Sequence, residues 1–444
     1  ATLRLALEDP DLKVVRESAT ALLRQCAKDR EFAEIAMGLL HDLVGATMLK
    51  EFSGEVKLFV GEELSIPEAR LLGSLTGRNP RLEVLYMRAR LPVGLLRRNE
   101  LAEFSLKTAA VLKKSPGLAE SIVMLDCMRP VAERSALRSL EVTGAVRLPV
   151  DALLGHTVEN VKMAGQGMSD ADAIVLLEYM RANRSAKTCD LSGNRVGTDG
   201  LKALAQMLEV NPALEELDIS DNLFHDHIAG AGDSSELDRQ GALQALKSFG
   251  EALASRRNNV SVVKVDVVDI DVAQLRALRK KPYFGAVALK DLDLSYHTRE
   301  MDYTGVPLKL TDIDMCVLAP LIKVFEGVAA LDLHGNALTA RGMGPLVWAF
   351  KRGVRQTSPS VTSLVLTDNP ILNRGLTVLG PGLKMENTLQ TLDLTGTGLE
   401  GTKGVEALEC IFRVPSAAHS KKQGVPSIRK VVLARNELGP QGVS

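Results

Sequence analysis

Residues 214–224 read LEELDISDNLF, and their spacing is L-x-x-L-x-L-x-x-N-x-L with isoleucine and phenylalanine at two of the apolar positions. The first, fourth and sixth residues, Leu214, Leu217 and Ile219, alternate in a way that predicts a short strand buried on one side. Asn222 follows where the chain turns, so its amide is expected to bond backbone groups that the turn leaves unpaired. This stretch therefore predicts a strand-and-turn unit.

The same pattern recurs in phase along the chain. Four further copies keep the asparagine, at residues 186–196, 328–338, 361–371 and 428–438. Three copies keep the apolar positions but lose the asparagine, at residues 260–268, 289–297 and 389–397. Recurrence of this unit is typical of leucine-rich repeats, in which one unit buries its strand only against its neighbours.

The interval between turns is most often about 28 residues, which leaves room for a full helix after each strand. In this respect residues 158–444 resemble the ribonuclease-inhibitor class of leucine-rich repeats. That class includes ribonuclease inhibitor, the sensor arms of NACHT immune receptors, tropomodulin and the Ran GTPase-activating protein. The resemblance implies an α/β solenoid with a curved parallel sheet inside and helices outside. Its members share no single activity.

Apolar positions at helical spacing predict the outer helices, and the strands of the eight copies are expected to form one parallel sheet in chain order. Helices are predicted at residues 170–181, 199–208, 236–256, 272–280, 312–325, 341–350 and 403–412. Intervals longer than the base period predict insertions at residues 225–235, 298–311, 353–360 and 413–427. The first two insertions are expected on the same edge of the sheet, at the carboxyl ends of the strands.

The region before residue 158 follows the pattern less closely. Residues 1–50 are predicted to form a helical cap, or a hairpin that resembles a single HEAT repeat. Residues 51–157 are predicted to be degenerate leucine-rich repeats. Their strand candidates are residues 56–60, 82–87, 122–127, 137–142 and 158–163.

Composition narrows the class of partner and compartment. A net charge of -1 and an aromatic content of 4% give no reason to expect nucleic acid as a partner. Five cysteines, odd in number and far apart, are typical of a reducing compartment, so a cytoplasmic location is expected, with the cytoskeleton or a cilium as a more specific alternative. No apolar run approaches about 18 residues, so no membrane insertion is expected. The start at Ala1 and the end just after a turn predict a fragment of a longer protein.

We find no phosphate-binding loop, dinucleotide fingerprint, zinc motif or nucleophile elbow in the sequence. The segment His225-Asp226-His227 carries metal-ligand residue types, but a solvated loop is the simpler interpretation. No cofactor and no enzymatic activity are therefore predicted.

The candidate site is a protein-binding surface on the strand side. One row of equivalent strand positions contains Asp190, Asp218, Lys264, Asp293 and Asp332, and Lys264 is expected to lie between Asp218 and Asp293. The row is either an acidic stripe for a basic partner or simply a position at which this class of repeat favours aspartate. The other candidate partner-binding residues are Asp266, Tyr296, Tyr303 and His334.

The leading functional prediction is a non-catalytic intracellular scaffold that binds a protein partner through its concave face and same-edge insertions. One alternative is a GTPase regulator of the Ran-activator type, although the acidic tail of that family is missing here. Another alternative is a cytoskeletal or axonemal component built into a large assembly. A fourth alternative, the arm of an immune receptor or a bacterial effector, would need further domains.

Overall fold

Residues 328–350 show how one repeat is built. In the computed structural model, strand β14 (Val328–Asp332) is followed by a turn and then by helix α15 (Ala340–Phe350). Val328, Leu331 and Leu333 are fully buried, as the alternation of apolar positions predicts. A strand, a turn and an outer helix therefore make one unit, called here a helical unit.

The structure describes residues 50–52, 55–59, 64–78, 84–86, 90–98, 100–106, 117–128, 137–229, 235–277, 290–294, 308–324, 328–350, 361–385, 389–412 and 428–440. The chain divides into two compact units, which are treated separately. The first comprises Ala1–Lys187 and Gly193–Ala213, and the second comprises Thr188–Ser192 and Leu214–Ser444.

The first unit contains two small sheets and a layer of helices. Its elements are β1 (Lys50–Phe52), β2 (Glu55–Phe59), α4 (Ile66–Arg78), β3 (Val84–Tyr86), β4 (Arg90–Leu91), α5 (Val93–Arg98), β5 (Glu103–Ser105), α7 (Leu118–Met128), β6 (Ser139–Glu141), β7 (Arg147–Leu148), α8 (Val150–Leu154), β8 (Asn160–Lys162), α9 (Asp170–Ala182) and α10 (Thr198–Leu208). Strand β2 pairs in parallel with β3, and β5 pairs in parallel with β6.

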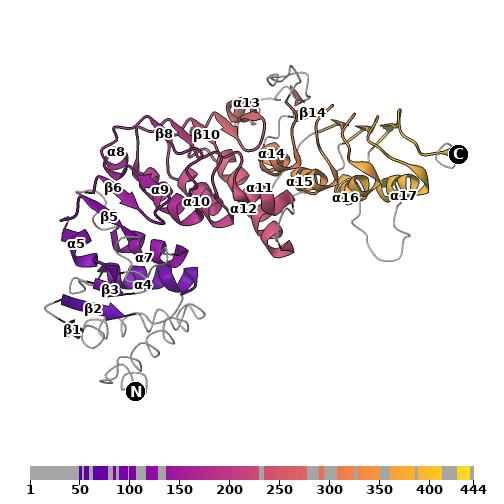
Figure 1. Ribbon diagram of the computed structural model, residues 1–444. Helices are drawn as coiled ribbons and strands as arrows, with labels where there is room; N and C mark the ends of the chain where they lie inside the picture. The colour runs from indigo at the N-terminus through magenta and orange to yellow at the C-terminus, as the bar shows by residue number, and fades with distance from the viewer. Residues whose placement is uncertain are drawn as a thin grey trace. The chain divides into compact units, whose positions relative to one another are not determined.

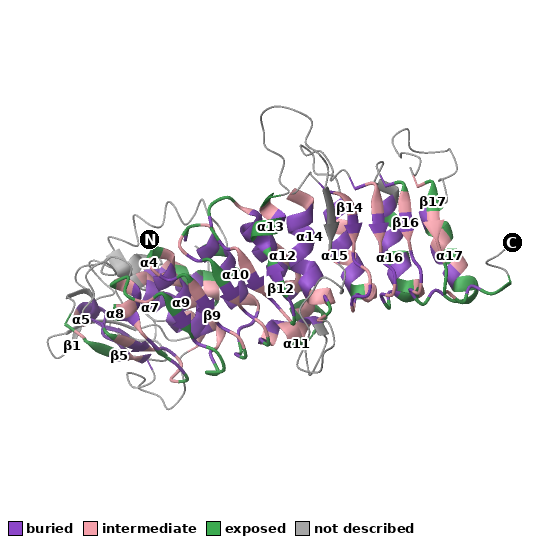
Figure 2. Ribbon diagram, turned by 90° about the horizontal axis from the view of Figure 1, so that it is seen from above, coloured by how far each residue is buried: buried purple, intermediate pink, exposed green. Residues whose placement is uncertain are grey.

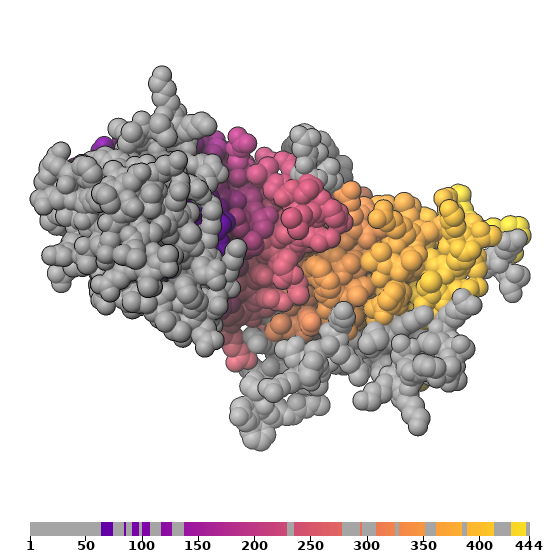
Figure 3. Space-filling view, turned by 90° about the horizontal axis from the view of Figure 1, so that it is seen from below, coloured from indigo at the N-terminus to yellow at the C-terminus, as the bar shows by residue number. Residues whose placement is uncertain are grey.

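The second unit places its strands on one side and its helices on the other (Figure 1). Its elements are β9 (Thr188–Asp190), β10 (Glu216–Asp218), α11 (Leu223–Ala229), α12 (Glu236–Ala254), β11 (Val262–Lys264), β12 (Asp269–Asp271), α13 (Val272–Ala277), β13 (Lys290–Asp293), α14 (Asp312–Val324), β14, α15, β15 (Ser363–Val365), α16 (Leu372–Met385), β16 (Thr391–Asp393), α17 (Gly401–Phe412) and β17 (Lys430–Val432). Buried residues recur along its strands and helices (Figure 2). In the space-filling view the repeats of this unit follow one another in chain order (Figure 3).

The strands of the second unit form two sheets, which contradicts the expectation of one sheet. Strands β9, β10 and β11 are parallel, but β12 pairs antiparallel with β11 and ends this run. Strands β13 to β17 form a separate parallel sheet in chain order. The physical reason is that residues 269–271 occupy the edge of β11 and take the hydrogen bonds that a following parallel strand would need.

The same set of asparagine hydrogen bonds recurs at the turns of this chain and links successive helical units. The Asn369 side-chain amide donates to the carbonyls of Leu333, Leu366 and Thr367, at 2.7, 3.0 and 3.2 Å. Its oxygen accepts from the backbone N–H of Leu338 at 3.1 Å. The residue is fully buried, so it satisfies backbone groups of two successive units that water cannot reach. Asn194, Asn222, Asn336 and Asn436 make equivalent bonds.

A second link joins the first residues of the helices. The Asp170 carboxylate accepts hydrogen bonds from the N–H groups of Gly197 and Gly200, about one repeat later. Asp312 accepts in the same way from Thr339 and Gly342 in the second unit. A carboxylate at the start of one helix thus bonds the N-terminal turn of the following helix.

Three units depart from this design and are called here hairpin units. In each, an antiparallel strand and a short helix replace the turn and the long helix: β3–β4–α5, β6–β7–α8 and β11–β12–α13. Each carries three buried residues at one spacing, which are Leu91/Val93/Leu96, Leu148/Val150/Leu153 and Ile270/Val272/Leu275. The segments before residue 158 that look degenerate therefore include a second, regular kind of repeat.

Two further expectations are wrong. The sequence predicts a strand at residues 122–127, but these residues form part of helix α7. The reason is that Ile122 to Leu125 are all buried and show none of the apolar–polar alternation of a half-buried strand. The sequence predicts a loop at residues 225–235, but the first part of this insertion belongs to helix α11. Phe224 and Ile228 are both buried and lie four residues apart, which is the spacing of one helical face. Helix α16 was not predicted. Residues 1–49, 298–307, 353–360 and 413–427 lie outside the described residues.

Candidate binding surface

The solvent face of strands β9 to β12 is a four-stranded grid of side chains. Each strand has one buried residue at its centre, which is Cys189, Leu217, Val263 or Ile270. Because residues alternate between the two faces of a strand, the residues before and after each of these lie on the solvent face. The strand register places these neighbours in two rows. One row is Thr188, Glu216, Val262 and Asp271, and the other is Asp190, Asp218, Lys264 and Asp269.

This acidic strand face, defined by the two rows, carries five carboxylates and the single cation Lys264. Glu216, Asp269 and Asp271 are exposed, whereas Asp190, Asp218 and Lys264 are half-buried. Neighbouring strands lie about 4.8 Å apart, where like charges repel by about 1 kcal/mol even in water. The face therefore presents a concentrated negative charge that a cationic group would relieve.

Lys264 lies between Asp218 and Asp269, whereas the sequence placed it between Asp218 and Asp293. The difference follows from the hairpin unit, because β12 returns alongside β11 and brings its own aspartates. Asp269 and Asp271 are site residues that sequence reasoning missed. The alternating run Val268-Asp269-Ile270-Asp271-Val272 is the signal that could have found them.

Part of the aspartate row also has a structural use. The Oδ1 atom of Asp190 accepts from both the N–H and the hydroxyl of Ser192, and Asp218 does the same with Ser220. Asp332 accepts from the N–H of His334. These bonds close the turn after the strand, which explains why aspartate recurs at this position. They engage one carboxylate oxygen and leave the side chain on the solvent face.

The other predicted residues of the second unit do not all join this face. Asp266 accepts a hydrogen bond of 2.7 Å from the Thr311 hydroxyl at the start of α14, so it secures that helix. The backbone of Asp293 pairs with Asp332 in the second sheet, and its side chain lies outside the described residues. Tyr296 and Tyr303 also lie outside them.

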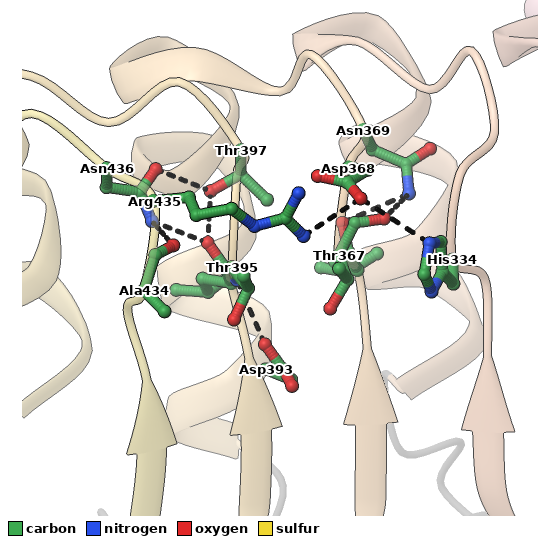
Figure 4. Close-up of polar contacts among 12 residues, drawn as sticks. His334, Thr367, Asp368, Asn369, Asp393, Thr395, Thr397, Ala434, Arg435 and Asn436 are labelled. Carbon is green, nitrogen blue, oxygen red and sulfur yellow. Dashed lines mark hydrogen bonds and ion pairs between the residues drawn. The ribbon is translucent and has the colours of Figure 1, made fainter.

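His334 belongs to a charged cluster at the carboxyl ends of β14 to β17 (Figure 4). Asp368 Oδ2 lies 3.4 Å from His334 Nε2 and 2.9 Å from an Arg435 guanidinium nitrogen. Asp368 and Arg435 both have positive φ angles, of 56° and 55°, at a turn position that glycine occupies in other units. The intervening Gly396 has no side chain, and a Cβ there would collide with the Asp368 carboxylate.

The His225 side chain links two neighbouring repeats of the second unit. Its Nδ1 accepts from the Asn222 N–H at 2.9 Å, and its Nε2 lies 2.6 Å from the Val265 carbonyl, to which it donates. Both ring nitrogens are therefore used within the fold. Within the described residues, no group of three or more His, Cys, Asp or Glu side chains could hold a metal ion.

The buried thiols are poorly suited to nucleophilic chemistry. The thiols of Cys189 and Cys316 are both buried. Burial, with the nearby Asp190 charge, raises the pKa of Cys189 to about 12, and burial also raises the pKa of Cys316. A thiol of this kind stays protonated near neutral pH and behaves as a small apolar side chain.

Comparison with known proteins agrees with the repeat architecture. A family model described as "Leucine Rich repeat" matches residues 187–205, and no curated protein matches the chain. The matched segment and the recurring strand–turn units support a leucine-rich repeat architecture. Among the helices that the structure describes, none is both long and apolar enough to cross a lipid bilayer.

Two solved structures are reported as similar. Actin-binding site 2 of leiomodin-1 is 12% identical, with a TM-score of 0.19, and the match covers 39% of this chain and 76% of that one. An internalin of Listeria monocytogenes is 13% identical, with a TM-score of 0.20, and the match covers 70% of this chain and 88% of that one. At these TM-scores neither likeness bears on the function of the chain.

Proposed function

We propose that the chain is a non-catalytic protein-interaction scaffold of the ribonuclease-inhibitor type, which binds a basic segment of a partner protein on the acidic strand face. The observation that carries the proposal is the excess of carboxylates on that face, where Glu216, Asp269 and Asp271 are exposed. The subtype is supported by the successive helical units β14–α15, β15–α16 and β16–α17, each with a helix of 11 to 14 residues.

The partner chemistry follows from the charge pattern. Carboxylates on neighbouring strands repel one another, so a partner that places lysine or arginine between them gains attraction and removes repulsion. Val262 and Thr188 lie in the same grid and offer a smaller apolar contact beside the charges. His334 and Asp332 lie on the second sheet and form a separate candidate surface. No feature of the described residues favours a GTPase-regulating role or a cytoskeletal role over the general scaffold.

The test compares partner capture by matched charge reversals. Glu216→Lys with Asp271→Lys reverses two exposed charges on the face, and Glu406→Lys with Glu409→Lys does the same on the exposed side of α17. The immobilised chain is exposed to native lysate, and a photo-crosslinker at Val262 identifies what touches the face.

We expect a crosslinked partner whose retention falls with salt, is lost in the face variant and persists in the α17 variant. Equal retention by the face variant would refute the proposal, as would the absence of any crosslinked protein. A partner released only by the α17 reversal would place binding on the helix side instead.

A further inference from the structure

The outer helices α15 and α16 differ in charge from the helices that precede them in the second unit. Helices α12 and α14 carry acidic residues in their first turns, as the helix dipole favours. Helices α15 and α16 contain no acidic residue, and their first turns carry Arg341 and Arg374 instead. A basic residue is disfavoured at this end of a helix, so the two arginines depart from the local preference. Departures of this kind are expected at functional surfaces.

Arg341 and Arg374 occupy the same position in two successive repeats. Each directly precedes a glycine, Gly342 or Gly375, whose missing side chain lets the start of the helix pack closely on the preceding repeat. Both arginines are exposed, and Arg374 makes no ion pair among the residues that the structure describes. Packed helices are spaced by about 8–10 Å, so one short ligand can reach both arginines.

Apolar side chains beside these arginines are open to solvent. Val378 is 39% exposed, and Trp348 is half-buried. On α15, Arg341, Gly344 and Trp348 recur at the spacing of one helical face, and on α16 Arg374 and Val378 do the same. The two helices contact each other directly. These five residues define a surface called here the basic helix face.

Gly344 leaves open space in the middle of the basic helix face. A Cβ at this position would meet no atom within 4 Å. Trp348 follows one helical turn later, and the Nζ atom of Lys247 from α12 lies 5.4 Å from the centroid of its ring. Lys247 also pairs with Glu251 of α12 at 3.9 Å. An apolar side chain placed over Gly344 would therefore contact the indole, and an aromatic one would gain the most.

The charge of this face selects an acidic ligand. Arg341 and Arg374 can each receive a carboxylate through parallel N–H···O bonds. The Asp312 carboxylate beside them is already bonded by the start of α15. Exposed acids on α17, Glu406 and Glu409, repel an acidic ligand and limit the surface on that side.

We propose that the basic helix face is a docking surface for an acidic segment of a partner protein that also carries an aromatic side chain. The aromatic side chain lies over Gly344 against Trp348 and Val378, and the carboxylates pair with Arg341 and Arg374. This surface lies on outer helices and takes an acidic segment, whereas the acidic strand face takes a basic one. It does not rest on the proposed function, and the two sites succeed or fail independently.

The test uses a synthetic peptide and the fluorescence of Trp348, which is the single tryptophan of the chain. The peptide has roughly 12 residues, glutamates and phenylalanines separated by serines, so its extended length of about 40 Å crosses both helices. Because it contains no tryptophan, a saturable change in emission reports binding beside Trp348. A peptide with lysine in place of each glutamate and one with alanine in place of each phenylalanine serve as ligand controls.

Two variants of the full chain test the charge and the open space separately. Arg374→Glu reverses a charge of the face, and Lys403→Glu is its matched control, because Lys403 is exposed at the equivalent position of α17, directly before Gly404. Gly344→Gln covers the open space without a change of charge. It should fold at least as well as wild type, since its Cβ meets no atom and glutamine is a better helix former than glycine.

We expect the acidic peptide to bind with a Kd below about 1 mM. Binding should weaken about tenfold for Arg374→Glu and for Gly344→Gln, and it should change less than about twofold for Lys403→Glu. The alanine peptide should also bind about tenfold more weakly. Hydrogen exchange should show protection of residues 340–350 and 372–385 when the acidic peptide binds.

Several outcomes would overturn the proposal. These are no saturable change with the acidic peptide, equal binding of the lysine peptide, or undiminished binding by the folded Arg374→Glu and Gly344→Gln variants. If an oligonucleotide of thymidines binds as tightly as the peptide, the face reads negative charge alone and the proposal is wrong. If sedimentation shows that the chain pairs with itself and Gly344→Gln abolishes the pairing, the face is an interface between copies and the proposal is likewise wrong.

Discussion

Replacing Asn369 by alanine tests the turn chemistry directly. In the native structure the Asn369 amide donates to three backbone carbonyls, and its oxygen accepts from the Leu338 N–H. Alanine removes all four contacts in a fully buried site. Each of the three carbonyls keeps a second donor, which is the Asn336 amide for Leu333, the Asn369 N–H for Leu366 and the Gly335 N–H for Thr367. Thr397 occupies the equivalent position one unit later, and its hydroxyl donates only to the Leu394 carbonyl of its own unit, at 2.7 Å, apart from a longer contact of 3.4 Å to Asn436 (Figure 4).

The magnitude follows from the number of bonds lost. The two amide hydrogens serve three carbonyls, so the change removes about three net bonds at about 0.5–1.5 kcal/mol each, or roughly 2–4 kcal/mol. Asn369→Thr should retain the bond to Leu366, by analogy with Thr397, and lose about half as much. Asn373→Ala is the matched control, because its hydrogen bonds to the Glu400 backbone are exposed and water can replace them.

The assay is urea unfolding followed by the fluorescence of Trp348, the single tryptophan of the chain, which lies near the end of α15. With a slope of about 2–3 kcal/mol per M, a loss of 3 kcal/mol lowers the midpoint by about 1 M. The expected order of stability is wild type, then Asn369→Thr, then Asn369→Ala. A midpoint for Asn369→Ala equal to that of Asn373→Ala, or a threonine variant less stable than the alanine variant, would refute this account of the turn.

Two further predictions concern backbone strain and a buried charge. Asp221 is exposed with φ of 53°, at the position that Gly335 and Gly396 occupy in their own units, so Asp221→Gly should raise stability by up to about 1 kcal/mol; a lower melting temperature would contradict this. Burial raises the pKa of Asp170 above its usual 3.8, so the folded state binds more protons than the unfolded state between 3.8 and the native pKa. Stability contributed by Asp170 is therefore lost as the pH rises through that window and is constant above it. Asp170→Asn keeps the acceptor for Gly197 and Gly200, so it should be at least as stable as wild type near pH 7, with an advantage that shrinks toward about pH 4 in thermal melts.

The helical units could be predicted because their apolar spacing and their turn residues agree. The strand expected at residues 361–366 contains β15, and the helix expected at residues 341–350 is α15 with one residue added. Helix α16 escaped prediction because Gly380, Pro381 and Gly382 are poor helix formers. Packing overrides that preference, since a Cβ at Gly382 would lie 2.7 Å from a Val347 methyl group of α15.

The hairpin units were harder to predict because they share the first half of the leucine-rich pattern. In both Leu91-Pro92-Val93 and Leu148-Pro149-Val150 the same tripeptide precedes a short helix, and this repetition is the signal in the sequence. The repeat pattern also predicts only part of the candidate site. It correctly aligns Asp190, Asp218 and Lys264 on neighbouring strands. It does not predict the antiparallel pairing of β12 with β11, which brings Asp269 beside Lys264.

The hairpin unit β11–β12–α13 also separates the repeats of the second compact unit into two sets, whose stabilities are only partly coupled. In a repeat array, stability is a sum of unit terms and nearest-neighbour couplings, and an unbroken strand ladder carries part of each coupling. At residues 269–271 that ladder ends in an antiparallel strand, so strands β9–β12 and β13–β17 are coupled across this point by helix packing between α12 and α14. The unit is the natural boundary between two foldons, one carrying the acidic strand face and the other carrying Asp368 and Arg435. Ordering of one by a bound partner need not order the other.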